Sequence, residues 1–289
     1  MSKLLFLLAV CAMGAIAQPA SLGVRLTSEY AVTPNVVYGT QNNFDTHLDV
    51  YRPRNATAPT PTLIYIHGGG WVGGSKEGAF FQTMPYLERG WAVVNVQYRL
   101  GRISPGPAAV EDCLCALRWV IRNAKQNNFD VNKLVVTGHS AGGHLSLTTG
   151  MLGETDLHRQ CPGNELLQVA AIVNWYGITN VNDLLDGPNQ KSYAVGWLGS
   201  LPNREEIARR VSPLQYVRKG LPPIITIHGD ADPTVPYAHG MALTDALQKA
   251  GVHTKLVTIP GGKHGGFPPA EDARAFREIF AFLEAQGLK

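Results

Sequence analysis

The chain has 289 residues, of which 45% are hydrophobic and 16% charged, and its formal net charge at pH 7 is +3. The apolar content is ample for a buried core, and the small charge, without any block of Lys or Arg, argues against binding to nucleic acid or to a membrane surface. No internal repeat or low-complexity tract divides the sequence, so a single domain over residues 18–289 is expected.

The first 17 residues have the features of a secretory leader. Lys3 supplies a positive charge, residues 4–16 form a short apolar run, and residues 15–17 (Ala-Ile-Ala) match an A-x-A cleavage signal. The run is short for crossing a bilayer, and no later stretch is long and apolar enough to do so. The sequence therefore predicts a secreted or periplasmic protein that has no membrane attachment once the leader is removed.

The four cysteines bear on whether the protein is exported and whether it is attached to a membrane. Cys11 lies inside the leader, and a lipid anchor there is disfavoured by the bulky Val10 before it. Cys113 and Cys115 lie two residues apart in a helical pattern, so their side chains diverge and cannot easily bridge each other. One of them pairing with Cys161 is one interpretation, and three buried free thiols is the other. No second cysteine pair accompanies the C-x-C spacing, so a zinc site is not expected.

Hydrophobic periodicity after the leader predicts alternating strands and helices. Strands are expected at residues 36–38 and 47–51, as an edge hairpin, and then at 62–67, 91–97, 134–137, 169–175, 224–228 and 255–259. Helices are expected at residues 108–125, 238–250 and 273–286, with another beginning near residue 145. This order indicates an α/β fold with a mostly parallel central sheet, helices on both faces and a small insertion, residues 176–220, after the sixth strand. Ligands are then expected at the carboxyl ends of the strands.

The fifth expected strand runs into residues 138–142, Gly-His-Ser-Ala-Gly, which fit the pattern G-x-S-x-G. In this pattern a strand turns sharply into a helix, and the serine takes a strained backbone conformation that exposes its hydroxyl. The flanking glycines let the strand and the helix pack closely. Ser140 is therefore a candidate nucleophile, the alternative being an ordinary serine in a glycine-rich turn.

A glycine-rich loop, residues 67–71 (His-Gly-Gly-Gly-Trp), directly follows the expected strand 62–67. Its backbone N–H groups can turn toward a bound oxyanion, and lipases and esterases place an oxyanion-hole donor in such a loop. We assign the donors to Gly69 or Gly70 and to Ala141. A phosphate-binding loop would need Gly-Lys before Ser or Thr, and residues 73–76 (Gly-Gly-Ser-Lys) have the wrong order.

Polar loops also follow the last two expected strands. Asp230 and Asp232 lie in the first of them, and Asp230, directly after Gly229, suits the fixing of a turn, whereas Asp232 lies where a loop can aim it across the strand ends. Both can also be ordinary turn carboxylates. In the second loop His264 stands among glycines, which suits a general base that must reach a neighbouring loop.

The order Ser140, Asp232, His264 is that of α/β-hydrolases and not of chymotrypsin-like or subtilisin-like enzymes. Beyond the leader, nearly the whole chain resembles α/β-hydrolase-fold carboxylesterases. Residues 98–100 (Tyr-Arg-Leu) and 107–112 (Pro-Ala-Ala-Val-Glu-Asp) resemble the hormone-sensitive-lipase-like esterases. Their acid loop carries the triad carboxylate on its second Asp, so the resemblance favours Asp232.

Two departures narrow the resemblance. Gly101-Arg102 stands where hormone-sensitive-lipase-like enzymes usually have Pro-Glu, and too few residues precede strand 62–67 for their long helical cap. The compact plan, with Trp71 after the glycines and Gly-His-Ser-Ala-Gly-Gly-His-Leu at the elbow, is more similar to bacterial acetyl-xylan and feruloyl esterases. Any lid must then come from the insertion at residues 176–220.

Together these features predict a serine ester hydrolase that acts through an acyl-enzyme, without a metal or organic cofactor. The expected substrates are short-chain or aromatic acyl esters, either small molecules or acetyl or feruloyl groups on plant polysaccharide. Trp71, Trp175 and Trp197 are candidate walls of the substrate pocket, although Trp197 suits the core equally well. The alternatives are an arylformamidase or exopeptidase on the same fold, and a non-catalytic binding protein, which the complete set of catalytic residues disfavours. The sequence does not indicate an oligomeric state.

Overall fold

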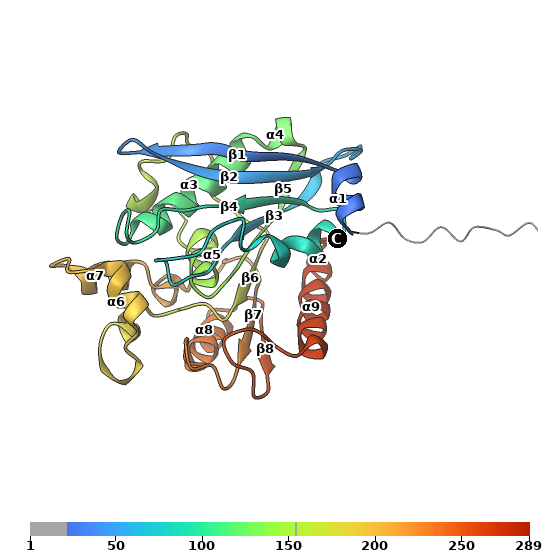
Figure 1. Cartoon of the computed structure of the whole chain (residues 1–289). Helices are drawn as coiled ribbons and strands as arrows, with labels where there is room; N and C mark the ends of the chain where they lie inside the picture. The colour runs from blue at the N-terminus through green and yellow to red at the C-terminus, as the bar shows by residue number, and fades with distance from the viewer. Residues whose placement is uncertain (1–21, 154) are drawn as a thin grey trace, which may run out of the picture.

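The computed structural model describes residues 22–153 and 155–289, so the expected leader at residues 1–17 lies outside the described part (Figure 1). No helix within the described ranges has the length and apolar character needed to cross a membrane. The strands are β1 (Tyr30–Gln41), β2 (Phe44–Pro53), β3 (Thr60–Ile66), β4 (Ala92–Val96), β5 (Phe129–His139), β6 (Ala171–Trp175), β7 (Ile224–Gly229) and β8 (Thr254–Ile259). The α-helices are α1 (Leu22–Glu29), α2 (Met84–Leu87), α3 (Ala108–Arg122), α4 (Ala124–Asn127), α5 (Ala141–Met151), α6 (Ser192–Leu198), α7 (Arg204–Arg210), α8 (Ala238–Lys249) and α9 (Pro269–Glu284).

These strands form one sheet in the order β1-β2-β4-β3-β5-β6-β7-β8. The pairs β1–β2 and β2–β4 are antiparallel, and every pair from β4 to β8 is parallel. The expected mostly parallel α/β sheet is therefore confirmed. The expected hairpin also forms, through a two-residue turn at Asn42-Asn43 in which both residues have positive φ, as type I′ turns require. One expectation was wrong: of the two hairpin strands, β1 lies at the edge of the sheet and β2 does not, because β2 pairs with β4 as well.

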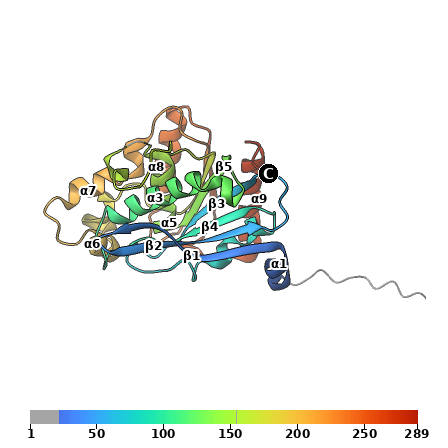
Figure 2. The same cartoon turned by 90° about the horizontal axis from the view of Figure 1, so that it is seen from above.

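The central strands separate two hydrophobic layers. In β3, Leu63 and Tyr65 point into one layer, and Ile64 and Ile66 point into the other, because successive side chains of a strand face opposite sides. Helices α3, α5 and α8 cover the layer of Ile64, while α2 and α9 cover the layer of Leu63. Figures 1 and 2 show α3 and α5 on one side of the sheet and α9 on the other. Because the strands from β4 to β8 are parallel, their carboxyl ends lie on the same side of the sheet, and the polar loops follow them there.

The expected insertion lies between β6 and β7 and contains α6 and α7 with short 3₁₀ turns. Its apolar residues do not form a separate layer: Ala194, Trp197 and Leu198 of α6 belong to the same hydrophobic core as α3 and α5. Two side chains also fasten it to the loop after β7, since Lys191 Nζ donates to Pro233 O at 2.9 Å and Tyr193 Oη to Thr234 O at 3.0 Å. The insertion is thus packed onto the body of the protein next to the strand ends.

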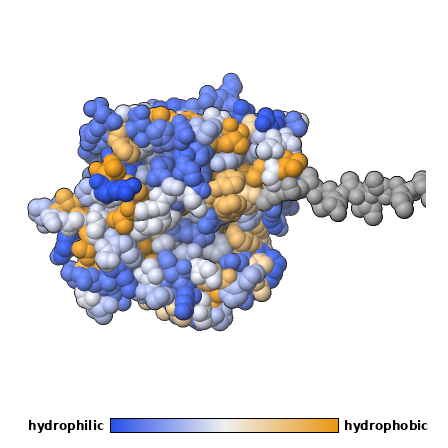
Figure 3. All heavy atoms as spheres, viewed as in Figure 1, coloured by the Kyte–Doolittle hydropathy of each residue, from blue (hydrophilic) through white to orange (hydrophobic). Residues whose placement is uncertain are grey.

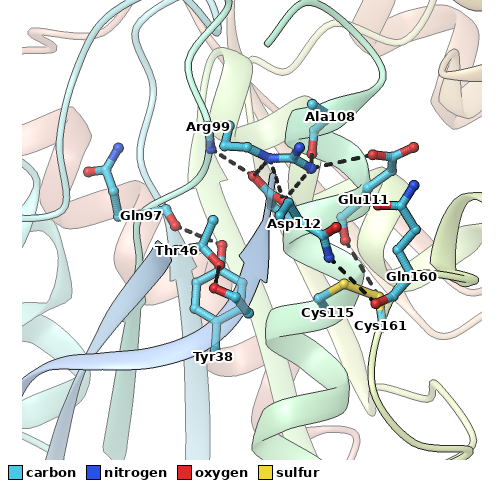
Figure 4. A network of polar contacts seen from close by, with 12 residues as sticks. Tyr38, Thr46, Gln97, Arg99, Ala108, Glu111, Asp112, Cys115, Gln160 and Cys161 are labelled. Carbon is cyan, nitrogen blue, oxygen red and sulfur yellow. Dashed lines mark hydrogen bonds and ion pairs between the residues drawn. A yellow bond between two sulfur atoms is a disulfide. The ribbon is translucent and has the colours of Figure 1, made fainter. Parts of the chain in front are cut away.

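A covalent link and a buried ion pair fix α3 (Figure 4). Of the two interpretations left open for the cysteines, the structure has the disulfide: Cys115 is bonded to Cys161, while Cys113 is free and buried. In the second turn of the same helix, Asp112 accepts hydrogen bonds from the guanidinium of Arg99 at 2.8–3.0 Å and from the Arg99 backbone N–H at 2.8 Å. Such bidentate pairs fix geometry as well as charge, so the segment after β4 is held in place against α3.

The surface shown in Figure 3 mixes hydrophilic and apolar residues, and apolar ones gather over α2 and its surroundings. Phe81, in the 3₁₀ turn Phe80–Thr83 before α2, is the most exposed large apolar side chain of the described residues, at 77%.

Candidate active site

Ser140 stands between β5 and α5 in a strained backbone conformation, with φ 60° and ψ −120°. The turn is possible because a Cβ on either flanking glycine, Gly138 or Gly142, would collide with the carbonyl oxygen of Ile66 in β3. Strand and helix therefore approach each other more closely than any other residue would permit. The expected elbow is present, and it lifts the Ser140 hydroxyl above the carboxyl edge of the sheet.

The three residues singled out from the loops form one hydrogen-bonded chain. His264 Nε2 lies 2.8 Å from Ser140 Oγ, and His264 Nδ1 lies 2.7 Å from Asp232 Oδ2. The side chain of Asp232 is fully buried, and that of His264 is 20% exposed. A nucleophile, a base and a carboxylate that orients the base are thus aligned within hydrogen-bond reach, which is the geometry that general-base activation requires.

Hydrogen bonds keep the Asp232 carboxylate ionised. Burial opposes its charge, but contacts from His228 and His264 and the backbone N–H of Val235 outweigh this cost, so the pKa of Asp232 lies well below its usual range. Its Oδ1 accepts the N–H groups of Thr234 at 2.8 Å and Val235 at 3.0 Å. The contact with His228 is one that the sequence analysis missed, and its only signal was the position of this histidine at the end of β7.

Asp230 has a different role, as expected from its place in the sequence. It is exposed, and its Oδ1 accepts the backbone N–H of Gly261 at 2.7 Å. This bond joins the loop after β7 to the loop after β8. Asp230 therefore fixes the turn between the two loops, and the chain from Ser140 to His264 continues to Asp232.

The expected oxyanion donors face the same space. Ala141 is the first residue of α5, where backbone N–H groups have no partner in the helix. The glycine loop runs through positive φ at Gly69 (118°), Gly70 (59°) and Trp71 (61°), and the N–H groups of its glycines at 69 and 70 donate to no acceptor in the described residues. Gly69 and Gly70 line the cavity at Ser140, and Ala141 directly follows this serine, so both sets of donors are available to bind an anionic oxygen formed there.

The candidate pocket walls Trp71 and Trp197 are a correction to the sequence analysis. Both are 0% exposed and their rings stack with centroids 4.2 Å apart. Trp71 Nε1 donates to His144 Nδ1 at 3.1 Å, and the other nitrogen of His144 bonds to Val211 O at 2.7 Å. Both rings belong to the hydrophobic core, where they pack against each other and against His144, and Trp71 thereby ties the end of the glycine loop to that core.

A second support for this loop comes from the segment after β4. Tyr98 Oη donates to the His67 carbonyl at 3.1 Å, and the two rings stack with centroids 4.3 Å apart. The Gly101 N–H donates to the carbonyl of Trp71 at 2.8 Å. The Tyr-Arg-Leu segment, itself fixed by the pair of Arg99 with Asp112, thereby holds both ends of the oxyanion loop.

A cavity of about 350 Å³ opens at Ser140, within the size range of small-molecule sites. Its lining comprises Gly68, Gly69, Gly70, His139, Ser140, Tyr176, Tyr193, Thr234 and His264. Tyr193 comes from the insertion and approaches Gly70 so closely that a Cβ there would lie 2.7 Å from the Tyr193 Cβ. The insertion therefore contributes a wall of this cavity through Tyr193, and Trp197 contributes none.

A second cavity of about 290 Å³ adjoins the first and shares His139 and Tyr176 with it. Trp175, the third candidate wall, is 3% exposed and lines this neighbouring cavity together with Phe81 and Phe276. Of the three candidate tryptophans, Trp175 therefore lies beside the site, though not against Ser140. No group of three His, Cys, Asp or Glu side chains in residues 22–153 and 155–289 is arranged to hold a metal ion.

Comparison with known proteins identifies the relatives of this chain. The BD-FAE family model matches residues 48–247, a range that includes Ser140 and Asp232. Esterase LipC of Mycobacterium tuberculosis is 28% identical over 228 residues, which are 75% of this chain. The chain spans only 56% of LipC, so it corresponds to little more than half of that curated relative.

Solved structures match over more of their length. A truncated carbohydrate esterase from gut microbiota aligns with a TM-score of 0.76 and 28% identity, covering 90% of this chain and 98% of that one. The esterase Est2 of Thermogutta terrifontis aligns with a TM-score of 0.74 and 28% identity, covering 90% and 94%. The sheet order and these matches show the α/β-hydrolase fold.

Proposed function

The chain belongs to the BD-FAE family, and on that basis, together with the geometry at Ser140, we propose that it hydrolyses carboxylic esters through an acyl-enzyme. The observation that carries the proposal is the unbroken chain of hydrogen bonds from Ser140 through His264 to Asp232, facing free backbone N–H groups. A non-catalytic relative would not need the serine, the histidine, the aspartate and the oxyanion donors all correctly placed relative to one another.

In the proposed mechanism His264 Nε2 removes the proton of Ser140 Oγ as this oxygen attacks the ester carbonyl carbon. Asp232 holds the tautomer in which His264 Nδ1 carries a proton, and its negative charge stabilises the imidazolium that forms. The imidazolium then protonates the leaving alcohol. Water, activated by the same base, attacks the acyl-enzyme and releases the acid.

The oxyanion that develops in both steps is bound by the N–H of Ala141 and by Gly69 or Gly70. These donors are in place before the substrate binds, so the reaction includes no free-energy cost for reorienting them. Loss of one such donor typically costs about 3–4 kcal/mol of transition-state stabilisation. The stacked pair of Trp71 and Trp197 maintains the loop that carries two of them.

We propose short-chain or aromatic acyl esters as substrates, among them acetyl or feruloyl groups on plant polysaccharide. Support for short chains is the modest cavity at Ser140, which Tyr193 closes on the insertion side. Support for aromatic groups is the adjoining cavity, whose lining includes Phe81, Trp175 and Phe276. The solved structure of a gut carbohydrate esterase is consistent with a sugar-linked ester.

Export is also a proposal. Residues 1–17 have the pattern of a secretory leader, and the Cys115–Cys161 disulfide suits an oxidising compartment. We therefore place the protein outside the cytoplasm, secreted or periplasmic.

The test is covalent labelling combined with turnover. A fluorophosphonate should modify the protein once per chain, the adduct should map to Ser140, and Ser140→Ala should neither be labelled nor hydrolyse p-nitrophenyl acetate. Turnover of a matched amide should be far slower than that of the ester. Labelling at another residue, or full esterase activity in Ser140→Ala, would refute the mechanism.

A further inference from the structure

A second histidine contacts the candidate catalytic carboxylate. His228 lies in β7, with its side chain fully buried, and its Nε2 is 3.0 Å from Val235 O and 3.4 Å from Asp232 Oδ2. Both of these atoms are acceptors, so Nε2 carries the proton and shares it between them. Its other nitrogen, Nδ1, is buried without a hydrogen-bond partner in the described part of the chain.

The Asp232 carboxylate therefore meets four N–H groups, which matches the roughly four lone-pair sites of a carboxylate. Its Oδ1 accepts two backbone N–H groups of its own loop, from Thr234 and Val235. Its Oδ2 faces His264 Nδ1 at 2.7 Å and His228 Nε2 at 3.4 Å. Of these four donors to the Asp232 carboxylate, His228 is the one in a strand of the sheet, and the other three lie in loops.

The ring of His228 is closely confined. A Cβ at Gly240 in α8 would lie 2.9 Å from His228 Nδ1, so this helix packs directly against the ring. Tyr237 packs edge-on with ring centroids 5.6 Å apart, and Tyr176 does so at 6.4 Å. Together with His239, Asp232 and His264, these tyrosines are the titratable groups around the ring.

From this geometry we propose that His228 is a positioning residue, which aims the Asp232 carboxylate at His264 by tying the acid loop to β7. The inference rests on the proposed function, in which Asp232 orients the base. Without the N–H at Nε2, the loop loses two attachments at once, at Val235 O and at Oδ2 of Asp232. The carboxylate can then rotate away from His264, although every group that touches substrate is still present.

Three substitutions separate this role from simple packing. His228→Gln keeps an N–H near the place of Nε2, His228→Asn is polar but too short to reach Asp232, and His228→Phe fills the volume without a donor. We expect kcat for p-nitrophenyl acetate to fall about 10- to 100-fold in the Phe and Asn variants, because misplaced catalytic groups cost about that much. KM should stay the same, and the Gln variant should recover most of kcat. The exposed His253, replaced by Phe, is the matched control and should change neither constant.

A spectroscopic measurement makes the test independent of turnover. The proton between His264 Nδ1 and Asp232 should give a far-downfield ¹H resonance in the native protein, weakened in the Phe and Asn variants and restored by Gln. The proposal would be overturned if the folded Gln, Asn and Phe variants had the same kcat as one another, or if all three kept the resonance of the native protein. If the Phe variant does not fold, the Asn and Gln pair decides. A native protein inactive on every ester refutes the proposed function, whereas the resonance still reports on His228.

Discussion

Trp71 and Trp197 stack face to face, with ring centroids 4.2 Å apart and 16° between their planes. Trp71 ends the oxyanion loop, and Trp197 lies in α6 of the insertion between β6 and β7. The contact therefore joins the loop that binds the oxyanion to the segment that walls the cavity. Neither element is expected to keep its position without the other.

Truncation of this contact should cost both stability and activity. Trp197→Ala should lower the free energy of unfolding by about 3–5 kcal/mol, the usual cost of removing a buried tryptophan. It should also lower kcat/KM, because the loop carrying Gly69 and Gly70 loses its support. Denaturant titration and ester turnover measure the two effects. Leu166→Ala, at a side chain that is 59% exposed and lines neither cavity, is the control and should change stability by less than about 0.5 kcal/mol and leave kcat/KM unchanged.

The two acids after β7 should respond oppositely to the same change. Asp232→Asn should lower kcat by several orders of magnitude with little change in fold, because the amide no longer stabilises the imidazolium of His264. Asp230→Asn should mainly lower stability, since it weakens the bond to the Gly261 N–H. Steady-state kinetics and thermal melting compare them. An inactive, well-folded Asp230→Asn beside an active Asp232→Asn would reverse the assignment.

Three histidines with lowered pKa values should make the fold sensitive to acid. Burial lowers the pKa of the buried His67 and His144 to about 4 and that of the half-buried His139 to about 3, from 6.5. Between pH 6.5 and about 4 the unfolded chain therefore binds more protons than the folded one, so stability falls as the pH falls through this window. The loss should be about 1–2 kcal/mol per histidine at pH 5. Denaturant midpoints across this range measure it, and His144→Gln should make the dependence shallower.

The disulfide offers a prediction with a built-in control. It joins residues 46 apart in sequence, so Cys115→Ser should destabilise by about 3–4 kcal/mol in the chain-entropy model. Cys113→Ser keeps the crosslink and should cost less. Thiol titration of the unfolded, unreduced chain should find Cys113 free and Cys115 and Cys161 unreactive. Three reactive thiols at these positions would show that the crosslink does not form.

Substrate length should follow the size of the cavity at Ser140. Each methylene that finds no apolar contact forgoes about 0.8 kcal/mol of binding, so acetyl to butyryl esters should be preferred over decanoyl and longer ones. The measurement is kcat/KM across a p-nitrophenyl acyl series, with methyl ferulate and acetylated xylan alongside. A steady rise toward palmitate would contradict the proposed substrate class.

The ends of the strands could be predicted because the hydrophobic pattern of a strand, and the glycine or polar residues that end it, lie within a few residues of one another. Ser140, Asp232 and His264 each follow a short apolar run, and parallel strands bring such ends together wherever they lie in the chain. The disulfide partner of Cys161 was undecided, because the phase of α3 decides which of the two helix cysteines faces the loop. That phase depends on packing against the sheet.

The tryptophans and His228 could not be predicted for the same reason. Trp71 and Trp197 are 126 positions apart, and no local pattern states that an aromatic after a glycine loop will turn inward. His228 reads as the last residue of a strand, and its contact with Asp232 depends on how the following loop folds back. In both cases tertiary packing decides the role.

The outer edge of β1 pairs with no strand among the described residues. An unpaired strand edge is a template for pairing with another chain, and β1 is long, with exposed Val32 and Val37. However, its register with β2 shifts twice, between Thr33 and Val36 and between Val37 and Gly39. Pro34 lacks a donor, and the N–H of Asn35 is consumed by Asp49 at 2.8 Å. These interruptions leave few consecutive backbone groups that a strand of another molecule could hydrogen-bond. This edge should therefore resist aggregation even when the protein is concentrated.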